Sequence, residues 1–175
     1  MKNFLLLIPI LLFSIGCSSQ QYMDTAGIQE IIRAEEFTFM ATKANATNQD
    51  VLNTANSLPH YGASRMMSLD YGYTLTIKDK ELTATLPYFG RLYTANAYDT
   101  DKQSLRFTSK DYTIQKSTTK KGNQLLRITP SDVSHIRTLN LEIYRNGKAF
   151  LSVDANDRQP ISFDGYMMKN EAVRN

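Results

Sequence analysis

The sequence predicts a mainly β domain, built as an antiparallel sandwich or a strongly curved sheet of about eight or nine strands with one short N-terminal helix. Apolar residues recur at every second position in many short runs, which is the period of a half-buried strand. Short turn sequences separate most of these runs, and short connections make neighbouring strands antiparallel. The 175 residues are enough for one domain with its own core.

The chain begins with a segment that is typical of export. Lys2 precedes an apolar run of 12 residues at positions 4–15, interrupted only by Pro9 and Ser14. A membrane-spanning helix needs about 20 residues, so this run is too short to cross a bilayer. It fits the apolar core of a signal peptide, which we place at residues 1–16.

The run ends in Ile15-Gly16-Cys17, which resembles the bacterial lipobox. In that motif a small residue precedes a cysteine that is lipidated and becomes the new N-terminus. Ser14 departs from the usual leucine, but Cys17 is the single cysteine of the chain and stands where lipidation would need it. We predict cleavage between Gly16 and Cys17 and a covalent lipid on Cys17 that anchors the protein to a membrane. The alternative is an ordinary signal peptide with an incidental cysteine.

We divide the mature chain into a polar tether at 17–23, a single β-rich domain at 24–168 and a frayed tail at 169–175. The domain starts with a helix over 24–36, capped by Asp24 or Thr25. Its isoleucines are spaced for one apolar face that must dock on the sheet: Ile28, Ile31 and Ile32.

A strand over 37–42 follows the helix, and a hairpin begins at Leu69. Alternation predicts one strand over 69–77 and a second over 81–87, joined by a two-residue turn at Asp79-Lys80. Pro87 ends this second strand or places it at an edge. The register that keeps apolar side chains on one face pairs Tyr73 with Leu86, Leu75 with Ala84 and Ile77 with Leu82.

Five further strands follow. Three are centred on Leu105–Phe107, Tyr112–Ile114 and Leu126–Ile128, and the other two are the arms of a hairpin over 138–154. A three-residue loop with Gly147 in the left-handed conformation keeps this hairpin in phase. Its predicted pairs are Leu139 with Val153, Leu141 with Leu151 and Ile143 with Ala149. The last strand contains Ile161 and Phe163 and ends at Gly165.

Four blocks together resemble the domain-of-unknown-function family 4251, exported lipoproteins of Bacteroidetes. The blocks are 37–41, 86–91 (Leu-Pro-Tyr-Phe-Gly-Arg), 139–141 and 158–166 (beginning Arg-Gln-Pro-Ile-Ser-Phe), within a match over about 30–168. The resemblance implies an envelope lipoprotein with a β-rich domain, and it implies no activity. In that lineage acidic residues after the lipidated cysteine mark surface export. Residues 18–21 contain none, which favours the periplasmic side of the outer membrane.

Composition excludes some function classes. The formal charge is +3, to which Lys2 of the leader contributes one, so nucleic acid is not an expected partner. No catalytic constellation and no metal site is predicted, and covalent lipid is the only attached group. His60 and His135 stand alone, and the Asp99-Thr-Asp101 sequence lacks the glycine and glutamate of a calcium loop.

The best candidate binding residues are aromatic. They could stack a sugar or a peptide at a loop rim, and the alternative explanation is edge packing where strands end, the usual role of such residues in a β protein. The predicted ligand-binding set is Tyr88, Phe89, Arg91, Tyr93 and Tyr98.

Three hypotheses for function follow. The first is a non-catalytic envelope lipoprotein that binds an envelope protein or glycan or has a structural role. The second is a curved sheet that encloses an apolar or glycan ligand with Tyr71, Tyr73, Phe89 and Tyr93. The third is a hydrolase that uses Asp99, Asp101 or Asp157. A large apolar cavity would favour the second, and two converging carboxylates would favour the third.

Overall fold

The computed structural model describes residues 20–46, 53, 56–57, 65, 67–93 and 104–170. These residues contain one helix of several turns, α2 (Thr25–Ala34), and nine strands. The strands are β1 (Phe37–Ala46), β2 (Thr74–Lys78), β3 (Glu81–Pro87), β4 (Ser104–Ser109), β5 (Tyr112–Thr118), β6 (Gln124–Pro130), β7 (Ile136–Ile143), β8 (Lys148–Ala155) and β9 (Ile161–Met168).

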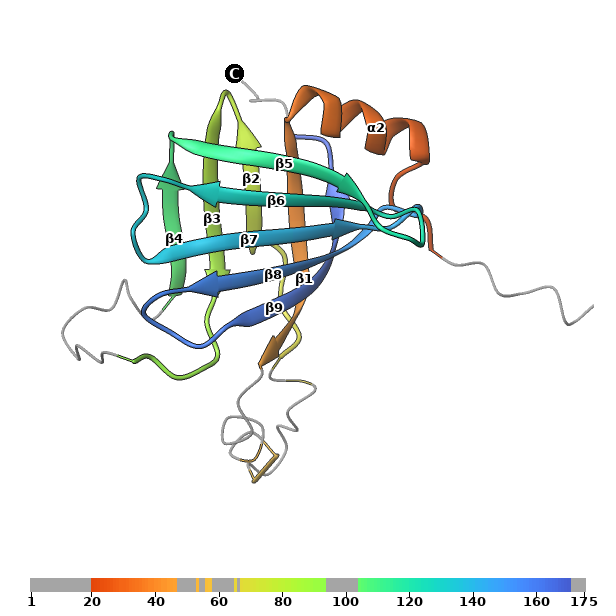
Figure 1. Cartoon of the computed structure of the whole chain (residues 1–175). Helices are drawn as coiled ribbons and strands as arrows, with labels where there is room; N and C mark the ends of the chain where they lie inside the picture. The colour runs from red at the N-terminus through yellow and green to blue at the C-terminus, as the bar shows by residue number, and fades with distance from the viewer. Residues whose placement is uncertain are drawn as a thin grey trace, which may run out of the picture.

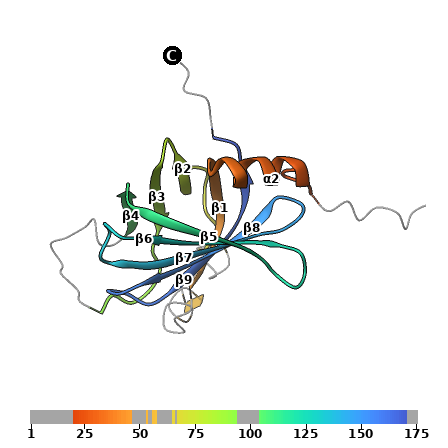
Figure 2. The ribbon, with the colours of Figure 1, turned by 45° about the horizontal axis from the view of Figure 1, so that its top comes forward.

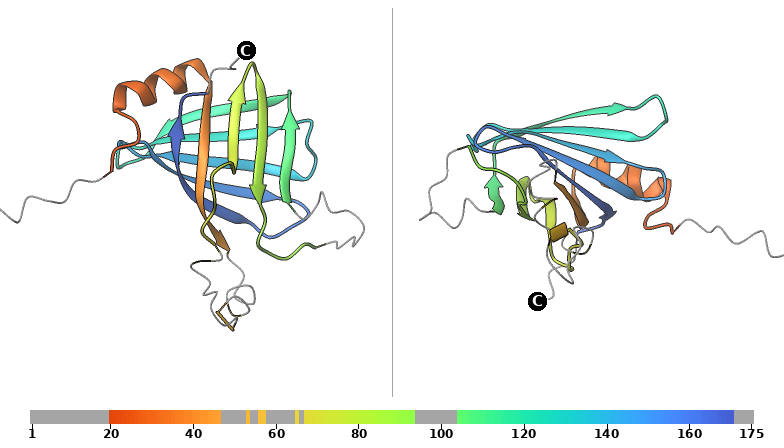
Figure 3. Two further views of the ribbon diagram at one scale, coloured as in Figure 1. Left: turned by 180° about the vertical axis from the view of Figure 1, so that it is seen from behind. Right: turned by 90° about the horizontal axis from the view of Figure 1, so that it is seen from below.

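All nine strands belong to one antiparallel sheet with the order β4-β3-β2-β1-β9-β8-β7-β6-β5. The sheet folds over on itself, so that β1 to β4 form a layer behind β5 to β8 and the strands of the two layers cross (Figure 1). The view from below in Figure 3 shows the two layers meeting at one side. Strands β4 and β5 follow one another in the chain but form the two free edges. The strongly curved sheet is therefore the confirmed alternative of the two that the sequence predicted.

Apolar side chains fill the concave side of the sheet. Phe37, Phe39 and Phe163 are fully buried there, together with alternate residues of the other strands. Helix α2 lies across one end of the sheet (Figure 2) and buries Ile28, Ile31 and Ile32 in this core, as predicted. The Asp24 side chain caps the helix by accepting a hydrogen bond from the Gly27 N–H at 2.9 Å.

Both predicted hairpin registers are confirmed within the ladders. Leu75 faces Ala84 and Ile77 faces Leu82, around a two-residue turn in which Asp79 and Lys80 both have positive φ. In the β7–β8 hairpin Gly147 has a φ of 80°, and the predicted facing pairs Leu139–Val153, Leu141–Leu151 and Ile143–Ala149 are present. Facing apolar pairs on a half-buried surface thus determine register in both hairpins.

The prediction of a strand over 69–73 is wrong, and so is the ladder pair of Tyr73 with Leu86. The Leu69 N–H bonds to the Thr42 carbonyl, and the Ala41 N–H bonds to the Tyr73 carbonyl, both at 2.9 Å. Between these two bonds the chain loops outward through Gly72, whose φ of 115° suits glycine. Strand β1 has a register shift at this point and continues past the predicted end at 42 to Ala46.

Gly165 does not end the last strand, which continues to Met168. It faces Ala41 on β1 and Ala149 on β8, and a Cβ on it would collide with the Met40 carbonyl oxygen. Glycine is needed here for close approach of two backbones rather than for a turn.

The predicted fray at 169–175 is wrong for Asn170. Its amide donates to the Ile77 carbonyl at 2.8 Å and accepts from the Thr38 hydroxyl at 2.9 Å, so the chain after β9 is tied to the outer face of β1 and β2.

Candidate functional site

The predicted aromatic site lies where the chain leaves β3. Tyr88 and Phe89 pack against the core rather than forming an open rim. The Tyr88 hydroxyl lies 3.0 Å from the carbonyl oxygens of Arg91 and Gln159, and its single proton is shared between these two acceptors. Tyr93 points outward and is 61% exposed. The structure therefore buries Tyr88 and Phe89 in part as packing residues, whereas the nearby Tyr93 ring is left exposed.

Arg158 explains why Tyr88 faces inward. Its side chain is 2% exposed and forms a bidentate pair with the carboxylate of Asp157, with both N–O distances 2.9 Å. A third donor, Nη1, reaches the Ser104 carbonyl at 2.9 Å, and the guanidinium lies 5.0 Å from the centroid of the Tyr88 ring. A buried guanidinium requires such complete pairing. We call Tyr88, Asp157 and Arg158 the Arg158 cluster.

The Arg158 cluster joins three segments that are distant in sequence. Backbone bonds from the Tyr93 N–H to the Asp157 carbonyl (2.8 Å) and from the Gln159 N–H to the Arg91 carbonyl (3.1 Å) run beside it. The segment after β3, the start of β4 and the β8–β9 connection are thereby held together. Sequence reasoning missed Arg158, although it begins one of the blocks of the family resemblance.

The electrostatics of the Arg158 cluster suit a structural role. The hydrogen bond from Arg158 lowers the pKa of Asp157, and burial raises the pKa of Tyr88. Asp157 is thus held as a carboxylate by a partner that already occupies both oxygens. This arrangement gives no support to Asp157 as a hydrolytic acid, which would need a raised pKa.

The remaining predicted residues have these positions. His135 is half-buried, with its ring edge-on to Phe107 at a centroid distance of 6.2 Å. Among the described residues, no group of three or more His, Cys, Asp or Glu side chains could hold a metal ion. The other residues singled out in the sequence lie outside the described residues: Gly16, Cys17, His60, Tyr98, Asp99 and Asp101.

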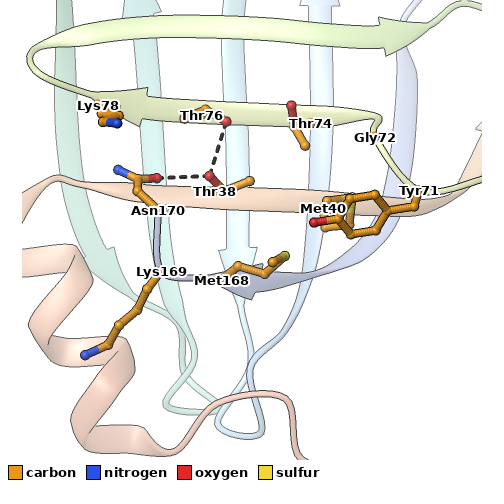
Figure 4. A pocket seen from close by; sticks show the side chains of 10 residues that line it. All are labelled: Thr38, Met40, Tyr71, Gly72, Thr74, Thr76, Lys78, Met168, Lys169 and Asn170. Carbon is orange, nitrogen blue, oxygen red and sulfur yellow. Dashed lines mark hydrogen bonds between the residues drawn. The ribbon is translucent and has the colours of Figure 1, made fainter. Parts of the chain in front are cut away.

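A pocket of about 280 Å³ opens on the outer face of β1 and β2 (Figure 4). It forms because Asn170 and the loop before β2 rise on either side of these strands. The lining residues are Thr38, Met40, Tyr71, Gly72, Thr74, Thr76, Lys78, Met168, Lys169 and Asn170.

The floor of this outer pocket is a chain of hydrogen bonds. The Thr38 hydroxyl donates to Asn170 Oδ1 at 2.9 Å and lies 3.2 Å from the Thr76 hydroxyl. Because Thr38 uses its proton on Asn170, Thr76 is the donor in the second bond. The site therefore presents fixed hydroxyl and amide groups on a rigid ladder.

Tyr71 forms one end of the pocket beside Met40 (Figure 4). Met40 is 3% exposed although it lies on the outer face, whereas Tyr71 is 69% exposed. The strand predicted over 69–77 would have put Tyr71 on the inner face with Tyr73. Tyr73 packs against the core, and the interior that was proposed to hold a ligand is filled by side chains. The one clue in the sequence was Gly72, which permits the loop that turns Tyr71 outward.

Together these features define the class of protein: it is a single mainly β domain with a nearly closed curved sheet, a filled interior and an outer pocket. Among the described residues, no helix has the length and apolar character needed to cross a bilayer.

The chain belongs to the domain of unknown function family DUF4251, whose profile matches residues 19–167. It is also similar to the crystal structure of a DUF4251 family protein from Bacteroides eggerthii DSM 20697, with 13% sequence identity and a TM-score of 0.49. That similarity covers 83% of this chain and 89% of the other. No curated protein matches the chain.

Proposed function

We propose that this protein is a lipoprotein of the cell envelope that binds an envelope glycan in the outer pocket and catalyses no reaction. The position of Cys17 after the apolar run supports lipidation and anchoring to the outer membrane on its periplasmic side. The β domain is then the part of the protein that extends from the membrane toward its ligand.

One observation carries the proposed binding role: the exposed ring of Tyr71 stands beside fixed hydroxyl and amide groups. Sugars present apolar faces that stack on aromatic rings and hydroxyls that exchange hydrogen bonds with such groups. Lys78 and Lys169 also line the pocket, so an acidic sugar would find cations there, although Lys169 already pairs with Glu30 at 2.8 Å. A glycan is therefore a better match than an apolar ligand.

The anchor is tested by expressing Cys17→Ala in the native host. We expect the wild-type chain to incorporate labelled fatty acid and to remain in the carbonate-washed membrane fraction. The variant should do neither, because acyl chains supply stable membrane attachment. A variant that stays in the washed membranes would refute the anchor.

The pocket is tested with two matched substitutions, Tyr71→Ala and Tyr93→Ala. Both tyrosines are exposed, at 69% and 61%, but only Tyr71 lines the pocket. Loss of a stacked ring worth about 1.4 kcal/mol corresponds to about tenfold weaker binding. We expect this change for Tyr71→Ala alone when envelope glycan fragments are titrated by NMR. Equal affinities in both variants, or no glycan-induced shifts at the pocket in the wild-type protein, would refute the site.

A further inference from the structure

We propose that the end of the sheet from which the tether leaves lies flat against an anionic phospholipid surface. This basic end consists of the exposed Lys120 and Lys121 of the β5–β6 turn and the exposed Arg145 and Lys148 of the β7–β8 hairpin. The inference rests on the proposed lipid anchor and adds to it a defined orientation of the domain.

The tether is docked on this end of the domain. The N–H groups of Tyr22 and Met23 bond to the Asn146 carbonyl at 2.9 and 3.4 Å, and the Tyr22 ring stacks on Tyr166 with centroids 4.4 Å apart. Cys17 lies five residues before Tyr22, and an extended chain spans at most about 3.5 Å per residue. A lipid on Cys17 would therefore hold the β7–β8 turn within roughly 17 Å of the membrane.

The two basic turns are neighbours in space. Gln124 at the start of β6 pairs with Ile143 at the end of β7, which places the β5–β6 turn beside the β7–β8 turn. The Arg145 guanidinium comes so close to Gly122 that a Cβ there would lie 2.5 Å from Nη2. Figure 1 shows both turns at the same end of the molecule, beside the segment that leads into α2. Two pairs of cations, Lys120 with Lys121 and Arg145 with Lys148, thus form one surface although more than 20 positions separate them in the sequence.

These cations are available to a partner. Within the described part of the chain, none of the four takes part in a salt bridge, whereas Lys116, Arg137 and Lys169 each pair with a carboxylate. Three carboxylates lie near this end: Asp24, Glu142 and Asp164 accept hydrogen bonds from the Gly27 N–H, the Asn123 amide and the Asn45 amide. These neutral donors leave the carboxylates charged, but the four cations outnumber them, so the basic end has a net positive charge.

The same end also carries two partly exposed tyrosines. Tyr22 is 36% exposed and Tyr144 is 37% exposed. Tyrosine rings are enriched where a protein meets the lipid headgroups, because one end is apolar and the other polar. Each lysine or arginine near an anionic leaflet strengthens attachment about fivefold, and salt screens the effect. Cations, tyrosines and tether thus point to one occupant, an anionic phospholipid surface.

The test uses the full lipidated protein in vesicles of phosphatidylcholine alone or with 30 mol % phosphatidylglycerol, roughly the charge density that produces a negative surface potential. Lysines are acetylated briefly with an amine-reactive reagent, and each site is quantified by mass spectrometry. Lys110, 77% exposed in the turn between β4 and β5, is the internal control. We expect acetylation of Lys120, Lys121 and Lys148 to fall at least fivefold in the anionic vesicles only, with Lys110 unchanged and the difference lost at high salt.

A double variant, Lys120→Glu with Lys121→Glu, sharpens the test. It should float with the vesicles as the wild type does but lose the protection of Lys148. Anchored protein whose basic end is acetylated as fast in anionic as in neutral vesicles would overturn the proposed orientation. Protein that fails to float with either vesicle would instead show that the anchor itself is wrong, so the two failures are distinguishable.

Discussion

The two basic regions of this domain use the same chemistry in opposite ways. Arg158 is 2% exposed and donates hydrogen bonds to Asp157 and Ser104 within the fold. Arg145, in the β7–β8 turn, is exposed and outside every salt bridge among the described residues. The first arginine holds segments of the chain together, and the second is left free to meet a partner. A cation's burial and pairing, rather than its presence in the sequence, determine which of the two roles it has.

The largest expected effect comes from removing the buried arginine. Arg158→Ala removes the bidentate pair with Asp157, the hydrogen bond to the Ser104 carbonyl and the ring contact with Tyr88. We expect a loss of about 3 kcal/mol in the free energy of unfolding, measured by urea denaturation. The matched variant Arg145→Ala should change it by less than about 0.5 kcal/mol. Similar losses in the two variants would remove the basis of the comparison.

A smaller loss of unfolding free energy is expected at Tyr88, the tyrosine of the Arg158 cluster. Tyr88→Phe deprives the Arg91 and Gln159 carbonyls of a donor at a partly buried site, which costs about 1–2 kcal/mol of unfolding free energy. Tyr144→Phe, at the opposite end, should be neutral within about 0.5 kcal/mol because Tyr144 is an exposed surface residue. If both variants unfolded at the wild-type urea concentration, Tyr88 would contribute only packing.

The smallest effect is a pH dependence. The pKa of Asp157 is lowered in the folded state by its bond to Arg158, so its stabilising contribution is complete above the unfolded pKa of about 3.9 and is lost as the pH falls through the folded value. Asp157→Asn should therefore be less stable than the wild type at pH 7, and the two stability curves should converge below about pH 4. Parallel urea midpoints from pH 7 to pH 3 would contradict the role of the carboxylate.

How much could be predicted from the sequence depended on the range of the interactions. The hairpin registers at Leu75–Ala84 and Leu141–Leu151 were predictable because facing pairs lie close in sequence and share one apolar phase. The segment 69–73 was not, because Leu69 and Tyr73 form hydrogen bonds with Thr42 and Ala41 of β1, a strand distant in sequence, rather than with the β3 ladder. Alternation alone could not reveal this competing partner.

The sites depended on contacts that a single sequence does not show. Tyr88 and Arg158 are 70 residues apart, and nothing in composition marks which of several arginines will be buried beside an aromatic ring. The outer pocket arises from Tyr71 on a loop and Asn170 after the last strand, two positions whose expected structure was wrong. The basic end was equally hidden, because Lys120 and Lys121 are more than 20 positions from Arg145 and Lys148 in the sequence.

Amide hydrogen exchange on the lipidated protein tests the contrast between the two ends most directly. The account predicts that, on transfer from detergent to anionic vesicles, exchange slows in the turns at 119–123 and 144–147 and stays the same at 88–93 and 156–159. Slowing confined to the Arg158 end, or equal slowing at both ends, would contradict it.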